Sequence, residues 1–258
     1  METLLVDRAE GVVTVTLNRP EKKNAANDTM WDELTSVFGE VARTAGDRVL
    51  VVTGAGGAFC SGADLTGGSG SPGGEGGMAR MRRIGSVALA LHRLPKPTIA
   101  KVGGVAAGAG CNLALGCDLV VASDDARFSE IFAKRGLSLD FGGSWLLPRL
   151  IGLHKAKELA FFADVISAGE AERLGFVNRV VPAAELDSFV DDWARRLAAG
   201  PPTALSMTKT MLNGALALSM DEALEAEARV QNVNFGTKDF QEAIAAFLQK
   251  RDPVFEGH

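Results

Sequence analysis

The sequence GGVAAGAGCNLALGCD, residues 103–118, is the stretch around which the rest of the chain is arranged. A β-like run at residues 98–102 leads into it, and residues 111–115 contain no proline and predict a short buried helix. The small residues 108–110 leave backbone N–H groups uncovered at the start of that helix, where internal acceptors are missing and the helix dipole favours negative charge. The stretch predicts either a site for an oxyanion or phosphate, or close packing of a helix end beneath a strand.

The chain before this stretch alternates strands, turns and helices. Residues 4–17 predict a hairpin, and Asp28 or Thr29 is placed to cap the helix that follows. The apolar run at residues 49–53 predicts a buried strand that ends in a second glycine turn, at residues 54–57. This second turn is a further candidate for exposed N–H donors.

Two more loops are rich in glycine. Residues 67–77 (GGSGSPGGEGG) are of low complexity, and we expect a mobile surface segment or a plain linker there. Residues 136–145 carry one carboxylate, Asp140, at their centre. Helical patterns then dominate, and the composition changes at Gly-Pro-Pro near residue 200. We predict an α/β core over residues 1–200 and a C-terminal helical region over residues 201–258.

The composition excludes several classes of function. The 258 residues include 27 Lys and Arg against 32 Asp and Glu, a formal net charge of -5, so we expect no nucleic-acid partner. Three cysteines without a CxxC pair disfavour zinc and disulfides and suit a reducing cytoplasm. No apolar run approaches the roughly 20 residues of a membrane span, and no leader pattern is apparent. We therefore expect a soluble, cytoplasmic protein without a membrane partner.

Motifs for common cofactors and nucleophiles are missing as well. The glycines around Ala109 lack the third member of G-x-G-x-x-G, and neither a P-loop nor a nucleophile elbow occurs. The chain has no Tyr, which excludes short-chain dehydrogenase chemistry, and its three histidines, His92, His154 and His258, are expected to be surface or capping residues. We expect no metal and no nicotinamide. Backbone N–H donors near Ala63 and Ala109, with the Asp140 carboxylate, remain as candidate catalytic groups.

Several ordered segments resemble the crotonase family, also called the enoyl-CoA hydratase/isomerase superfamily, and look most like its ring 1,2-epoxyphenylacetyl-CoA isomerase branch. They are residues 18–20 (NRP), 23–25 (KNA), 59–65 (FCSGADL), 104–110 (GVAAGAG), 117–118 (CD) and 142–143 (GG). The resemblance implies a spiral of ββα turns and a C-terminal helical region that forms a trimer, often as a hexameric dimer of trimers. It also implies an acyl-CoA thioester substrate, with coenzyme A as part of the substrate and no separate cofactor.

The resemblance also carries residue roles. The family's two oxyanion-binding N–H groups fall on Ala63 and Ala109; the second position is usually Gly, and Ala keeps the donor if its φ is negative. Contacts to CoA or the acyl group fall on nine residues, of which the last would reach a neighbouring subunit's CoA: Lys23, Ala25, Ser61, Gly62, Asp64, Leu65, Gly108, Phe132 and Phe255.

The departures from the family pattern concern the acids. Hydratases of the family use two glutamates, and the matching positions here are Asn112 and Phe132, which cannot move a proton. Glu130 could replace them if it shares a strand face with Phe132, although we expect a solvated or structural acid. Asp140 falls where family isomerases carry an acid, but it could instead cap the following helix.

These observations support three hypotheses. The leading one is an acyl-CoA isomerase in which Asp140 moves a proton; the others are an enoyl-CoA hydratase using Glu130 or a substrate-held water, and a catalytically silent acyl-CoA-binding homologue. A trimer or hexamer is expected because the helices after residue 202 carry an apolar stripe that a thin tail cannot bury alone. Its members are Leu205, Leu212, Leu216 and Leu224.

Overall fold

The computed structural model describes residues 1–66 and 76–258. Its main sheet has six strands in the order β1-β2-β3-β4-β6-β9. β1 (Leu4–Ala9) and β2 (Val12–Leu17) form the predicted antiparallel hairpin, and β3 (Val49–Gly54), β4 (Thr98–Val102), β6 (Leu119–Ser123) and β9 (Arg179–Val181) continue the sheet in parallel. A smaller sheet contains β5 (Val105–Ala107), β7 (Arg127–Ser129) and β8 (Ile166–Ser167).

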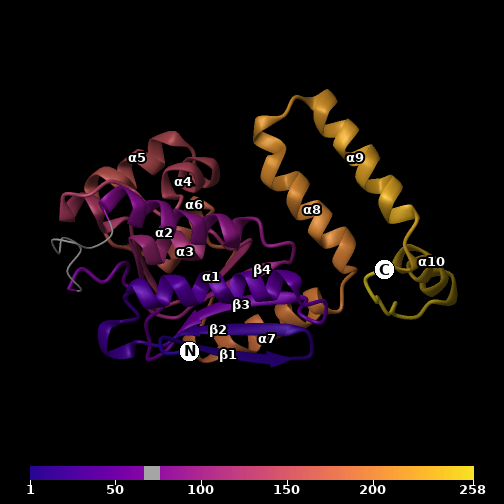
Figure 1. The fold of residues 1–258 in the computed structure, drawn as a ribbon, viewed down its shortest axis with the longest axis horizontal. Helices are drawn as coiled ribbons and strands as arrows, with labels where there is room; N and C mark the ends of the chain where they lie inside the picture. The colour runs from indigo at the N-terminus through magenta and orange to yellow at the C-terminus, as the bar shows by residue number, and fades with distance from the viewer. Residues whose placement is uncertain (67–75) are drawn as a thin grey trace.

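Helices cover both faces of the main sheet. α1 (Asp28–Arg43), α2 (Gly77–His92) and α3 (Ala109–Leu115) pack on one face, and α7 (Leu186–Ala198) packs on the other (Figure 1). Strand β3 shows the reason, since Leu50 and Val52 join the cluster beneath α1 while Val49 and Val51 join the cluster beneath α7. A parallel strand covered on both faces reads as one continuous apolar run.

The remaining helices complete the chain. They are α4 (Gly143–Ile151), α5 (Leu153–Phe162), α6 (Ala168–Leu174), α8 (Pro202–Gly214), α9 (Met220–Phe235) and α10 (Lys238–Gln249), with 3-10 turns at η1 (Pro20–Lys22), η2 (Ile131–Arg135), η3 (Ala183–Glu185) and η4 (Ala215–Ala217). Helices α8 and α9 form a hairpin that projects from the layered part, and α10 lies beyond them (Figure 1). An ion pair ties α8 to the core, because Lys209 Nζ lies 2.8 Å from Asp118 Oδ2.

One local detail differs from expectation, and one expectation falls largely outside the described residues. The cap of α1 is Asn27, not Asp28 or Thr29, because its side chain accepts a hydrogen bond of 3.0 Å from the Met30 N–H. The expected mobile segment, residues 67–77, lies outside the described residues except at its end, where Gly77 already begins α2. Among the helices in the described ranges, none is both long and apolar enough to cross a bilayer.

Candidate active site

The start of α3 is held against the segment that leads to Ala63. Cys60 forms a parallel bridge with Ala106, and its carbonyl accepts a hydrogen bond of 2.9 Å from the Ala107 N–H. A Cβ at Gly110 would lie 2.3 Å from that same carbonyl oxygen, so only glycine permits this approach. A Cβ built on Gly104 would lie 2.0 Å from the Gly57 carbonyl oxygen, so the two predicted glycine turns also lie side by side.

Two backbone N–H groups are left free where these turns meet. Ala26 donates to the Gly62 carbonyl and accepts from the Asp64 N–H, each at 2.8 Å, which leaves the Ala63 N–H between them with no acceptor in residues 1–66 or 76–258. Ala109 is the first residue of α3, and its N–H likewise lacks an acceptor within the described chain. A Cβ built on Gly62 would lie 3.7 Å from the Ala109 nitrogen, so both donors belong to one small region. Ala109 is not among the residues with positive φ, so the condition under which Ala can keep the main-chain donor is met.

Asp140 is the first residue of a sharp turn that leads into α4. Phe141 has φ +48 and Gly142 has φ +82, two consecutive left-handed conformations. The Phe141 ring is buried against Trp31 of α1, with ring centroids 5.4 Å apart, and this contact holds a conformation that a bulky side chain rarely adopts. The Gly143 N–H closes the turn on the Asp140 carbonyl at 2.9 Å.

Asn112 connects this turn to α3. Its Nδ2 donates to the Asp140 carbonyl at 3.0 Å. A Cβ at Gly143 would lie 2.4 Å from that same nitrogen, so the glycine leaves the space that the amide fills. Asn112 follows Ala109 by three residues and therefore shares its face of the helix. Asp140 is thereby fixed beside the helix that presents the Ala109 donor.

The Asp140 carboxyl is suited to accept a proton near neutral pH. Its Oδ1 is buried and lacks a hydrogen-bond partner in the described part of the chain. Burial raises the pKa of Asp140 to about 6, and the Arg80 guanidinium on α2 acts in the opposite direction. The alternative that Asp140 caps α4 is wrong, because the cap residue is Gly142 and its helix start receives no side-chain hydrogen bond from residues 1–66 or 76–258.

Glu130 was expected to be a solvated or a structural acid. It follows β7 directly and is only 3% exposed, so it is not solvated. Phe132 lies in η2, which means that the two residues do not share a strand face. Burial raises the pKa of Glu130 to about 7, and the Asp140 charge acts in the same direction.

Most of the residues expected to contact CoA gather around residues 61–65. The Ser61 N–H donates to the Lys23 carbonyl at 3.0 Å, and Arg19 reaches both the Ala25 carbonyl, at 2.6 Å, and Asp64, at 2.9 Å. Hydrogen bonds from Thr66, together with Arg19, lower the pKa of Asp64 to about 2, so this carboxylate is a fixed anion and not a base.

The environments of the remaining expected contacts differ. Phe132 is buried next to Gly108, where a Cβ would lie 3.6 Å from its ring. Leu65 is exposed on the surface beside Asp64. Phe255 is part of the C-terminal tail, which lies near α10 and away from the layered core (Figure 1). Within a single chain the structure therefore does not bring Phe255 to the other residues.

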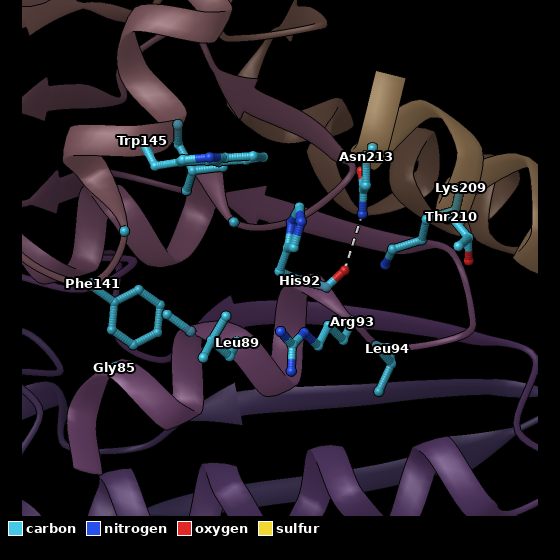
Figure 2. Close-up of a pocket in the computed structure, with 15 residues that line it drawn as sticks. Gly85, Leu89, His92, Arg93, Leu94, Phe141, Trp145, Lys209, Thr210 and Asn213 are labelled. Carbon is cyan, nitrogen blue, oxygen red and sulfur yellow. Dashed lines mark hydrogen bonds between the residues drawn. The ribbon is translucent and has the colours of Figure 1, made fainter. Parts of the chain in front are cut away.

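A cavity of about 690 Å³ lies between α2, α4 and α8, apart from these donors (Figure 2). Phe141 and Gly142 border it, whereas Ala63, Ala109 and Asp140 do not. His92, the half-buried last residue of α2, projects into this cavity and packs edge-on against Trp145, with ring centroids 5.1 Å apart. Because its lining includes neither the acid nor the two N–H donors, this cavity does not define the catalytic groups.

The whole arrangement matches a known family. Residues 7–258 match the family described as Enoyl-CoA hydratase/isomerase. The chain belongs to this family. It is 40% identical to 1,2-epoxyphenylacetyl-CoA isomerase of Escherichia coli strain K12, over 100% of this chain and 99% of that protein. It is 34% identical to short-chain-enoyl-CoA hydratase of Clostridium acetobutylicum, over 97% of this chain and 96% of that protein.

Solved structures of the enoyl-CoA hydratase/isomerase family confirm the fold. The enoyl-CoA hydratase of Bacillus anthracis superposes with a TM-score of 0.94 at 32% identity, over 99% of this chain and 100% of that one. The enoyl-CoA hydratase of Mycobacterium smegmatis superposes with a TM-score of 0.92 at 36% identity, over 98% of each chain. The expected crotonase-like α/β fold is confirmed, and the protein is an enzyme of this family with an acyl-CoA thioester as its substrate class.

Sequence reasoning missed two neighbours of Asp140. Asn112 was identified only as a position that cannot move a proton, whereas its amide holds the Asp140 turn. Arg80 carried no sequence signal, because its effect on Asp140 depends on how α2 packs beside a loop 60 residues later.

Proposed function

We propose that this enzyme isomerises an enoyl-CoA or a related acyl-CoA thioester, with Asp140 as the base. The observation that carries the proposal is the buried Asp140 carboxyl, whose Oδ1 has no hydrogen-bond partner among the described residues and whose turn Asn112 holds beside the helix of the Ala109 donor. Burial raises the pKa of this carboxyl to about 6, which suits a base near neutral pH. Asn112 and Phe132 stand at the two positions where hydratases of the family carry glutamates. Proton transfer within the substrate therefore fits these residues better than addition of water.

The proposed reaction gains and loses no atoms. The Ala63 and Ala109 N–H groups bind the thioester oxygen, and Asp140 removes a proton from the acyl chain. The electron pair of that C–H bond moves into the conjugated system and places negative charge on the oxygen, where each donor contributes about 10² to 10³ in rate. Asp140 then returns the proton to a different carbon, which moves the double bond.

Hydration is the second candidate, because Glu130 is another acid with a pKa near neutrality in the same region. In that reaction Glu130 would take a proton from water as the oxygen bonds to the alkene carbon. The apolar side chains around Glu130 argue against it, since they include Phe128, Leu147 and Ile166.

We further propose a trimer or hexamer in the cytoplasm that uses no cofactor besides the CoA of its substrate. Leu212 and Leu216 are 68% and 73% exposed in the single chain, which supports their burial by other subunits. Phe255 would then reach a neighbour's CoA. The three cysteines are free and buried, as suits a reducing compartment.

Turnover of a panel of enoyl-CoA and aromatic epoxy-CoA thioesters tests the proposal. Isomerisation leaves the product mass unchanged and shifts its NMR spectrum, whereas hydration adds the mass of one water.

Asp140→Asn should fold and bind acyl-CoA but lose about 10² or more in isomerisation rate, the scale of a general base. Asp164→Asn, on the surface, is the matched control and should keep full activity. Hydration that survives Asp140→Asn and is lost in Glu130→Gln would replace the isomerase proposal, and turnover of none of these thioesters would favour a silent binding protein.

A further inference from the structure

The buried Glu130 carboxyl has no part in the proton transfer described above. It is enclosed by α3, α4 and α5 and by the end of β7, and its neighbours around a small cavity are mostly apolar, among them Phe128, Leu159 and Phe176. Only 3% of the residue is exposed. A carboxyl group in such surroundings is costly to ionise, and its presence requires a reason.

A chain of polar contacts connects Glu130 with Asp140. Asn112 Nδ2 lies 3.3 Å from Glu130 Oε2 and 3.0 Å from the Asp140 carbonyl, so one amide group donates to both. Because the Asp140 carbonyl can only accept, this contact also fixes which end of the Asn112 side chain faces Glu130. Glu130 thus accepts a hydrogen bond from the amide that holds the Asp140 turn.

The same cluster has too many acceptors and too few donors. Asn112 Oδ1, Glu130 Oε1 and Asp140 Oδ1 are all buried and lack hydrogen-bond partners within the described residues. A proton on Glu130 turns one of these acceptors into a donor and removes one buried charge. Two ionised carboxylates in this enclosure would instead repel each other.

Burial and the Asp140 charge favour the neutral form of Glu130, whereas the hydrogen bonds from Cys111 of α3 and from Asn112 act in the opposite direction. Burial is the largest of these effects, and it also raises the pKa of the Cys111 thiol well above its usual value. Asp140 adds negative charge from the loop before α4. Asp164 borders the small cavity but is paired at 3.0 Å with Lys134 on the surface, and Arg80 acts on Asp140. Among these described neighbours, no cation is paired with the Glu130 carboxyl.

We propose that Glu130 is a positioning residue that works in its protonated form. It holds the Asn112 amide, which in turn fixes the Asp140 turn. Because Glu130 is neutral, the resting site carries one negative charge, that of Asp140. The inference rests on the proposed role of Asp140 as base. A second carboxylate would oppose the charge that develops on the thioester oxygen, so activity should require Asp140 ionised and Glu130 neutral. With pKa values of about 6 and about 7, the rate should pass through a maximum between them and fall on both sides.

The pH profile of Glu130→Gln tests this inference in the assembled enzyme. Glutamine retains a carbonyl for the Asn112 amide and a donor in place of the carboxyl O–H, but it cannot ionise. The kcat of this variant should stay within about threefold of wild type near pH 6.5 and lose the alkaline decline, which in wild type approaches tenfold per pH unit. Glu130→Leu removes the contact and should lower kcat by about tenfold or more with KM nearly unchanged, because the base is misplaced and substrate binding is not. Glu170→Gln, on the surface of α6, should reproduce the wild-type profile.

Carboxyl titration by carbon-13 NMR gives a readout that needs no turnover. Wild type should show one Glu carboxyl titrating near pH 7 that disappears in Glu130→Gln, and Asp140→Asn should lower the pKa of that carboxyl because the neighbouring charge is gone. If isomerisation is absent but this titration is present, the proposed function fails and the paired acids remain. If Glu130 titrates below pH 5, or if Glu130→Gln keeps the alkaline decline, the positioning role is overturned.

Discussion

Ala109 contributes through its main chain, and proline can remove that contribution selectively. It is the first residue of α3, a position where proline is tolerated because its missing N–H has no acceptor inside the helix. We predict that Ala109→Pro keeps the fold but lowers kcat by about 10² to 10³, the cost of one oxyanion donor. Steady-state assays with the preferred thioester measure the fall in kcat, and circular dichroism measures whether the fold is kept.

Ala109→Gly is the matched control for this prediction, because it retains the N–H group. It should keep activity within a few fold of wild type. A proline variant that is fully active while acyl-CoA binding is unchanged would show that the Ala109 donor does not stabilise the transition state.

Glu130 should also make stability depend on pH. Its pKa rises from the ordinary glutamate value of 4.5 to about 7 in the folded chain, chiefly through burial, so between these values the folded state binds more protons than the unfolded state. The free energy of unfolding should therefore fall as pH rises from about 4.5 to 7, by up to about 3 kcal/mol from this residue. Chemical denaturation at fixed protein concentration, from pH 5 to pH 8, should show a smaller fall in Glu130→Gln. Equal slopes in both proteins would mean that Glu130 binds its proton no more tightly when folded.

At the scale of elements, the packing of α3 against the segment before Ala63 depends on Gly110. A Cβ there would lie 2.3 Å from the Cys60 carbonyl oxygen and 2.7 Å from its Cβ, and both groups are buried. We predict that Gly110→Ala lowers the free energy of unfolding by about 1–3 kcal/mol or more and also impairs catalysis, because the two donors move apart. Gly169→Ala in α6, where the new methyl meets nothing within 4 Å, should instead stabilise by about 0.5–1 kcal/mol. Thermal melts of the two variants compare their Tm with that of wild type. Equal shifts in Tm would contradict the close approach of Gly110 to the Cys60 carbonyl.

The elements that could be predicted are those whose signal is local. The helix after the glycine turn and the hairpin followed from residue pattern, and α3 and β1–β2 confirm them. The Asp140 turn could not be derived this way, because its left-handed Phe141 is held by Trp31, 110 residues earlier in the chain. The condition under which Glu130 could replace Phe132, a shared strand face, is not met, since β7 has only three residues and ends at Ser129.

At the scale of the whole molecule, the family resemblance supplied what periodicity could not. Alternating strands and helices indicated an α/β fold, but the ordered motifs were needed to indicate the crotonase-like arrangement that solved relatives confirm. Burial of Glu130 lay beyond both kinds of argument. Its surroundings are formed by side chains from α3, α4 and α5 together, and a glutamate between Ser129 and Ile131 has no local sign of being enclosed.

The C-terminal helices carry the last prediction, which concerns assembly. No residue of α8 or α9 is fully buried in the single chain, and on α10 Phe247 and Leu248 are 81% and 74% exposed. Large apolar side chains gathered on projecting helices are unfavourable in water and typical of an interface. We predict a trimer or hexamer in sedimentation at micromolar concentration, and dissociation toward monomers in a Leu216→Asp, Phe247→Asp variant. Leu5→Asp, which adds the same charge at an exposed position of β1, should leave the assembly intact. A wild-type monomer would contradict the prediction, and so would a double variant that assembles as tightly as wild type, because burial of these side chains between subunits cannot tolerate unpaired carboxylates.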